Sequence, residues 1–185
     1  MDNFLTYFAY GSNLSSPRLQ ARTPSAEVIG RGVLDHHRLR FNKRGSDQSA
    51  KCSFDPAAGD EVHGVLYRIR RDERAILDHI EGVGRGYDVL DLSVRRPDGS
   101  SVTALTYRAS ESFRIEGLRP FDWYVEHVMH GMIEHGIARH CLEDVLRTGL
   151  RRDPDSERAK RERAIYTEGQ RTQLRMALAQ GEEQA

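Results

Sequence analysis

Short apolar runs separated by polar and glycine-containing segments fill the chain up to about residue 107, a pattern typical of β-strands joined by turns. Residues 5–10 form an unbroken apolar and aromatic run, which predicts a buried strand. The other predicted strands cover residues 26–33, 37–42, 51–54, 61–69, 87–94 and 102–107. The last two flank Pro97-Asp98-Gly99-Ser100, whose turn-forming residues predict a β-hairpin.

Beyond the hairpin, apolar residues recur at helical spacing. Pro120 opens a predicted helix that Gly136 ends, and a second predicted helix closes at Gly149. Shorter helices are predicted just after the first strand and from Asp72 onward. Strands first and helices mostly last indicate an α+β domain, in which helices flank a small mixed β-sheet that is curved or barrel-like.

Length and composition indicate one domain with a charged extension. The 185 residues suffice for one sizeable core. Charged residues and Gln dominate from residue 151 onward, so we expect a domain over residues 1–150 and a tail over residues 151–185 that is loosely held or partly helical. Lys plus Arg and Asp plus Glu both number 28, and this zero net charge argues against a nucleic-acid partner.

The chain shows no targeting or membrane signal. Residues 1–6 lack the basic and apolar regions of a secretory signal, and no apolar stretch approaches membrane-spanning length. We therefore expect a soluble, cytoplasmic protein with no membrane partner. Cys52 and Cys141 are far apart and lack metal-type spacing, so we expect inert fillers rather than a disulfide.

The end of the first strand is the first candidate site. Its apolar run stops at Gly11-Ser12-Asn13, residues that tolerate unusual backbone angles and hydrogen-bond their own main chain. Residues 15–17 then resemble the cap and first turn of a helix. Such a loop directs free backbone N–H groups toward one point, which suits a carboxylate or a developing oxyanion. The alternative is a tight turn that binds nothing.

Glu81 is the second candidate. It ends a predicted short helix and precedes three glycines within residues 82–86. Its apolar neighbours Ile80 and Val83 suggest partial burial of the carboxylate. Desolvation would disfavour the charged form and favour proton exchange near neutral pH. The alternative is an ordinary carboxylate in water at the end of a helix.

Three segments together resemble the gamma-glutamylcyclotransferase family, in the same order and at similar spacing. They are residues 7–14, which read YFAYGSNL, Glu81-Gly82-Val83 before Tyr87, and the helix start at residues 120–128. The resemblance covers roughly residues 5–150, and the chain looks like a bacterial-type member. It implies a gamma-glutamylcyclotransferase-like fold, no cofactor, a small-molecule gamma-glutamyl substrate, and a monomer or homodimer.

The resemblance also implies a reaction: cyclisation of gamma-glutamyl amino acids or amines to 5-oxoproline, with release of the amine. Because the substrate's own α-amine attacks its γ-carbonyl, the protein must supply a proton acceptor rather than a nucleophile. Glu81 matches the family's catalytic glutamate, the expected general acid and base. The residues expected to bind the substrate and the oxyanion are Tyr7, Phe8, Ala9, Tyr10, Gly11, Ser12, Asn13, Tyr107 and Tyr124.

Two rival interpretations stay open. One is a non-catalytic small-molecule-binding or interaction protein on the same fold, although such a protein gains nothing from a buried carboxylate beside an anionic ligand. The other is a metal site formed by Glu126, His130 and Glu134, which share one helix face. One straight helix spreads three such ligands too far apart for a single ion, so we expect a solvated face and no metal.

Overall fold

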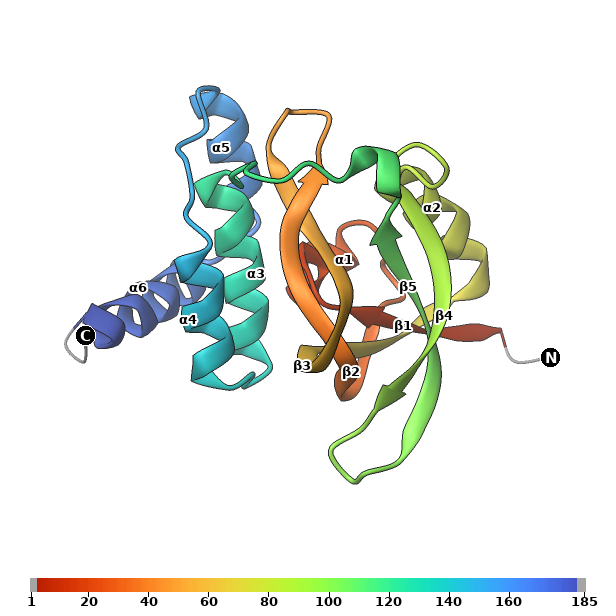
Figure 1. Cartoon of the computed structure of the whole chain (residues 1–185). Coiled ribbons are helices and arrows are strands. Elements are labelled where there is room, and N and C mark those ends of the chain that lie inside the picture. Colours follow the sequence, from red (N-terminus) through yellow and green to blue (C-terminus); the bar gives the residue numbers. More distant parts are fainter. Residues whose placement is uncertain (1–2, 183–185) are drawn as a thin grey trace.

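The computed structural model of the chain describes residues 3–182, and within them five strands close into a barrel in the order β1-β3-β2-β4-β5 (Figure 1). The strands are β1 (Phe4–Ala9), β2 (Glu27–Arg44), β3 (Ala50–Arg70), β4 (Tyr87–Arg95) and β5 (Ser101–Ala109). β1 pairs parallel with β5, whereas the other neighbours are antiparallel. The predicted α+β fold with a mixed, barrel-like sheet is confirmed.

β2 and β3 are each one long strand where the sequence predicts two shorter ones. At the predicted break in β2, His36 adopts a φ of 58° and the pairing with β3 shifts between Asp35 and His37. A β-bulge therefore bends β2 without ending it. The prediction of separate strands was wrong because the residues that suggested a turn form this bulge.

Helices cover two sides of the barrel. The helical elements are η1 (Ser12–Leu14), α1 (Ser16–Gln20), η2 (Arg71–Glu73), α2 (Arg74–Glu81), η3 (Glu111–Phe113), α3 (Asp122–Glu134), α4 (Arg139–Arg147), α5 (Ser156–Arg163) and α6 (Glu168–Glu182). Figure 1 shows α3 to α6 grouped on one side of the barrel and α2 on the opposite side. No described helix is both long and apolar enough to cross a membrane.

α3 packs against η1 at a glycine. A Cβ atom on Gly131 would lie 2.3 Å from Cβ of Leu14 and 2.5 Å from the backbone nitrogen of Ser15. Only glycine allows the two elements to come this close, and Leu14 is fully buried between them. The contact fixes the loop after β1 against the helical layer.

The charged C-terminal segment is anchored to α3 by Tyr166. The Tyr166 side chain is buried, and its ring stacks on His130 with 3.7 Å between ring centroids. Its hydroxyl lies 2.7 Å from Nδ1 of His127 and donates to Oγ of Ser15 at 3.0 Å. α5 and α6 lie in this segment, and a few buried contacts dock it on α3.

On α3, His127 and His130 are buried, whereas Glu126 is partly exposed and Glu134 is exposed. His127 is fully buried and His130 is nearly so. Glu126 accepts two hydrogen bonds from Arg163 of α5, and Glu134 accepts one from the backbone N–H of Ser16. The prediction of a solvated helix face holds for Glu134 but was wrong for His130, because helical periodicity does not reveal that Tyr166 packs on it.

Candidate active site

The loop after β1 leaves backbone donors without protein partners. A Cβ atom on Gly11 would lie 2.9 Å from Cβ of Cys52, so glycine lets the loop run directly over β3. In the part of the chain that the structure describes, the N–H groups of Gly11, Ser12 and Asn13 make no hydrogen bond to a protein acceptor. Adjacent free donors of this kind suit a carboxylate or an oxyanion.

Glu81 faces this loop from the last position of α2. The helix ends because Gly82 adopts the left-handed conformation, with φ 68° and ψ 48°. Oε1 of Glu81 accepts hydrogen bonds from Nδ2 of Asn13 at 3.0 Å and from the guanidinium of Arg22 at 3.1 Å. Oε2 makes no hydrogen bond to a described residue. One carboxylate oxygen is therefore anchored, and the other is left for a ligand.

Asn13 connects the components of this site. Its Oδ1 accepts a hydrogen bond from Arg22 at 2.8 Å, while its Nδ2 contacts both Glu81 and, at 3.0 Å, the hydroxyl of Tyr7. Burial, and then the charge of Glu81, raise the pKa of Tyr7 well above its usual value, so the hydroxyl stays protonated. The three side chains fix the orientation of the Glu81 carboxylate.

The Glu81 carboxylate is largely buried, but not by the residues that were expected to bury it. The Glu81 side chain is 15% exposed, but Ile80 and Val83, expected to bury it, are themselves exposed. Asn13 and Arg22 cover it instead. Arg22 was missed by the sequence analysis, since its partner is 59 positions away and no local pattern marks the pair.

Two hollows border Glu81, which lines both. The smaller has a volume of about 30 Å³ and the wider one, toward the surface, about 410 Å³. The smaller hollow is lined by Tyr7, Tyr10, Gly11, Ser12, Asn13, Cys52, Glu81, Tyr87, Tyr107 and Tyr124. Of the predicted binding residues, Phe8 and Ala9 are absent from this wall because they are fully buried in the barrel core.

The tyrosines of the small hollow are held by the main chain and by α2. Tyr124 accepts a hydrogen bond from the N–H of Cys52 at 2.9 Å, and Tyr87 donates to the Cys52 carbonyl at 2.7 Å. Tyr10 donates to the carbonyl of Tyr107, whose own hydroxyl donates to Asp78 at 2.7 Å. These hydroxyls form a rigid wall, and their positions are already fixed before any ligand enters.

The lining groups other than Glu81 are poorly suited to proton exchange. Burial raises the pKa of Tyr10 and Tyr124 well above that of a free tyrosine. Burial also raises the pKa of the Cys52 thiol to about 12, so it is protonated and a weak nucleophile near neutral pH. Among the residues that the structure describes, Glu81 is the one carboxylate that lines the small hollow.

Known proteins share this sequence and architecture. The sequence model of the AIG2-like family matches residues 61–144. Gamma-glutamylcyclotransferase of Homo sapiens is 31% identical over 148 residues, which cover 77% of each chain. The chain belongs to the gamma-glutamylcyclotransferase family. The Mus musculus gamma-glutamylcyclotransferase is 30% identical over 143 residues, or 74% of each chain.

Solved structures show that the gamma-glutamylcyclotransferase-family fold extends over nearly the whole chain. A gamma-glutamyl cyclotransferase structure superposes with a TM-score of 0.73 at 23% identity, covering 94% of this chain and 99% of that one. YkqA from Bacillus subtilis superposes with a TM-score of 0.68 over 82% of this chain and 56% of its own. The first of these matches extends beyond residue 150, so the shared fold includes part of the C-terminal segment.

In this gamma-glutamylcyclotransferase-family chain, the structure brings Glu81 together with all but two of the predicted binding residues. Besides Arg22, sequence reasoning missed Cys52 and Tyr87, which line the small hollow. Lys43 lines the wider one. Lys43 and Cys52 lie on the paired strands β2 and β3. Their position became apparent only with the closure of the barrel.

Proposed function

We propose that this chain is a gamma-glutamylcyclotransferase that converts gamma-glutamyl amino acids or amines to 5-oxoproline and releases the amine. The observation that carries the proposal is the unpartnered Oε2 of Glu81, which shares one small hollow with the free N–H groups of Gly11 and Ser12. The names of relatives about 30% identical support the same reaction.

The mechanism begins with proton removal by Glu81. Oε2 takes a proton from the α-ammonium group of the substrate, because the charged amine has no lone pair for attack. The neutral nitrogen then bonds to the γ-carbonyl carbon of the same molecule. The attack is intramolecular, so holding the substrate in a folded shape supplies much of the rate.

Collapse of the tetrahedral intermediate completes the reaction. Its oxyanion accepts hydrogen bonds from N–H groups of the loop at Gly11 and Ser12, which stabilise the charge as it develops. The bond between the γ-carbon and the leaving nitrogen then breaks. Protonated Glu81 returns the proton to that nitrogen, and the ring nitrogen loses its remaining extra proton to solvent. 5-Oxoproline and the free amine then leave with the carboxylate regenerated.

The remaining side chains of the site position these groups. Asn13 and Arg22 hold Oε1 of Glu81, which leaves Oε2 directed to the substrate. Tyr7, Tyr107 and Tyr124 form an aromatic wall around the reacting chain. Aromatic rings around the site lower the local dielectric constant and so strengthen each charge interaction inside it.

The decisive test is the variant Glu81→Gln, which keeps the size of the side chain and removes its basicity. We expect 5-oxoproline release from a panel of gamma-glutamyl amino acids and amines to fall by about 10²–10⁴-fold. Binding of 5-oxoproline, measured by calorimetry, should persist. The matched control Glu111→Gln changes an exposed glutamate outside the site and should retain full turnover.

Two outcomes would separate the alternatives. Near-normal turnover by Glu81→Gln would remove Glu81 from the mechanism. If the unaltered protein bound 5-oxoproline but turned over no member of the panel, a non-catalytic binding protein on this fold would be the better description.

A further inference from the structure

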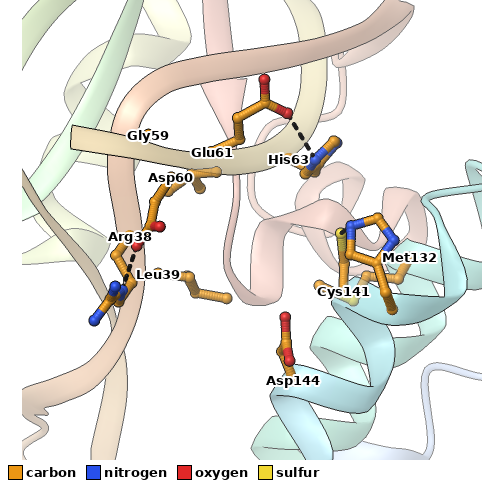
Figure 2. Close-up of a pocket in the computed structure, with 11 residues that line it drawn as sticks. Arg38, Leu39, Gly59, Asp60, Glu61, His63, Met132, Cys141 and Asp144 are labelled. Carbon is orange, nitrogen blue, oxygen red and sulfur yellow. Dashed lines mark hydrogen bonds and ion pairs between the residues drawn. The ribbon is translucent and has the colours of Figure 1, made fainter. Parts of the chain in front are cut away.

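A third hollow lies between the barrel and α4, and it has a volume of about 560 Å³ (Figure 2). It shares no lining residue with the two hollows around Glu81. On its wall, one ligand atom each from His63, His140 and Cys141 lie within 4.8 Å of one another. His63 belongs to β3, whereas His140 and Cys141 belong to the first turn of α4. The fold therefore assembles a cluster that the spacing of the cysteines does not indicate.

The three side chains have the chemistry of a metal site. Imidazole nitrogen and thiolate sulfur are the ligands that Zn²⁺ prefers, at about 2.0–2.1 Å and about 2.3 Å from the ion. Sγ of Cys141 lies 3.3 Å from Nε2 of His140, a separation compatible with two ligands of one tetrahedral ion. The His63 and His140 rings lie 5.9 Å apart between centroids and nearly perpendicular, so small rotations bring both nitrogens toward the sulfur.

We propose that His63, His140 and Cys141 bind Zn²⁺ as three protein ligands, with the fourth coordination position open to the hollow. Coordination displaces the proton of the Cys141 thiol, which passes to solvent. Three protein ligands plus an exchangeable fourth is a common arrangement for this ion.

Three carboxylates lie near the cluster. Oε2 of Glu61 lies 3.4 Å from Nε2 of His63, and carboxylates beside metal-bound imidazoles are their usual outer partners. Asp60 and Asp144 line the same hollow, and Figure 2 shows the Asp144 carboxylate directed into it from α4. Each of these carboxylates also pairs with an arginine: Asp60 with Arg38, Glu61 with Arg95 and Asp144 with Arg147. The hollow thus offers three ligands and nearby carboxylates whose charge is largely balanced.

An ion at this position would connect the barrel to the helical layer. β3 carries His63 and α4 carries the other two ligands, so the metal would cross-link elements that are otherwise joined by packing. Because Zn²⁺ would bind the folded state and lose its site on unfolding, it should raise the unfolding temperature. This stabilisation is independent of the Glu81 chemistry, so the two proposals succeed or fail separately.

Titration of the metal-free protein with Zn²⁺ tests the proposal. We expect one ion per chain by calorimetry and a rise in Tm. The variants His63→Ala, His140→Ala and Cys141→Ser should each weaken affinity by at least about tenfold. His79→Ala removes an exposed imidazole outside the cluster and should bind Zn²⁺ as the unaltered protein does.

Substitution with Co²⁺ gives a second readout. The bound ion should show the visible absorption of a four-coordinate site together with a thiolate charge-transfer band that Cys141→Ser abolishes. This substitution is nearly isosteric at a half-exposed position, so the variant should remain folded. Absence of saturable binding at one ion per chain, or equal affinity in the unaltered protein and the three variants, would overturn the proposal.

Discussion

Nδ2 of Asn13 donates a hydrogen bond to Oε1 of Glu81 at 3.0 Å, across 68 positions of sequence. This bond joins the loop after β1 to the end of α2, so the backbone donors and the carboxylate are held as one unit. Arg22 completes the unit by contacting both side chains. The first prediction concerns this arrangement.

Replacing Asn13 by Ala should lower kcat about 10- to 100-fold, because the Glu81 carboxylate loses a partner that orients it. KM should change less than kcat, since the backbone donors of the loop remain. Asn13→Asp should lower kcat further than Asn13→Ala does, because it places a second negative charge beside Glu81. The control Asn3→Ala alters an exposed asparagine before β1 and should leave both constants unchanged.

The contact between α3 and η1 predicts a strong effect of one methyl group. Gly131→Ala places a Cβ atom within 2.5 Å of three atoms of Leu14 and Ser15, so α3 or η1 must shift. We expect a loss of about 1–3 kcal/mol in the free energy of unfolding, together with lower turnover because η1 carries Asn13.

Gly169→Ala is the matched control for this substitution. It also adds a methyl group to a helical glycine, but the nearest atom, Oγ1 of Thr167, would be 3.9 Å away. Helix propensity alone predicts a gain of up to about 1 kcal/mol. Equal effects of the two substitutions in denaturant titrations would contradict the importance of the close approach.

Lys43 should distinguish leaving groups. Its ammonium lies 4.7 Å from the centre of the Tyr87 ring, lines the wider hollow and has no carboxylate within ion-pair distance among the described residues. A leaving amino acid carries a carboxylate, whereas a leaving amine does not. Lys43→Met should therefore raise KM about 10-fold for gamma-glutamyl amino acids and leave gamma-glutamyl amines unaffected.

The comparison variant for Lys43 is Arg44→Met, which removes the next cation along β2 but does not line the hollow. Arg44→Met should leave KM unchanged for both gamma-glutamyl amino acids and gamma-glutamyl amines. A uniform rise for both substrate classes in Lys43→Met would indicate loss of structure in place of loss of a carboxylate contact.

His127 should make stability depend on pH. Burial lowers the pKa of His127 to about 3; Glu162, 3.2 Å from Nε2, opposes this decrease, and Arg18, 2.8 Å from the same atom, adds to it. The unfolded chain takes up this proton below about pH 6.5, whereas the folded protein does not. The contribution of His127 to the free energy of unfolding is therefore fully present above about pH 6.5. It decreases as the pH drops toward 3, by about 2 kcal/mol at pH 5.

Denaturant unfolding at pH 7 and pH 5 would measure this effect. His127→Gln should have a shallower pH dependence than the unaltered protein, whatever its absolute stability. His79→Gln removes an exposed histidine and should keep the original slope. An unchanged slope in His127→Gln would exclude the buried imidazole as the cause.

Local pattern was sufficient for much of the fold. The apolar run at residues 5–10, the hairpin turn at residues 97–100 and the glycine at position 136 each act through neighbours in sequence, and each is found where predicted. The uninterrupted path of β2 through His36 could not be predicted, because a positive φ suits a turn and a bulge equally well.

The candidate site followed a similar division. The loop at Gly11 has a local signature. Glu81 followed from its place before three glycines together with the family resemblance, whereas its expected burial by Ile80 and Val83 is not found. Arg22 could not be found, because an arginine in a connection is ordinary until the folded chain shows what faces it. The same holds for His63 and Cys141, on elements that meet only in three dimensions.

The bond from Tyr166 to Ser15 makes the end of the chain part of the same mechanical unit as its beginning. Ser15 follows η1 directly, and Arg18 of α1 also pairs with Glu162 of α5, so the loop region is joined to the C-terminal helices by both contacts. Coupling of this kind is reciprocal. A ligand bound at the loop would therefore make opening of the C-terminal helices less favourable. A substitution in those helices would in turn change the affinity of the loop for the ligand.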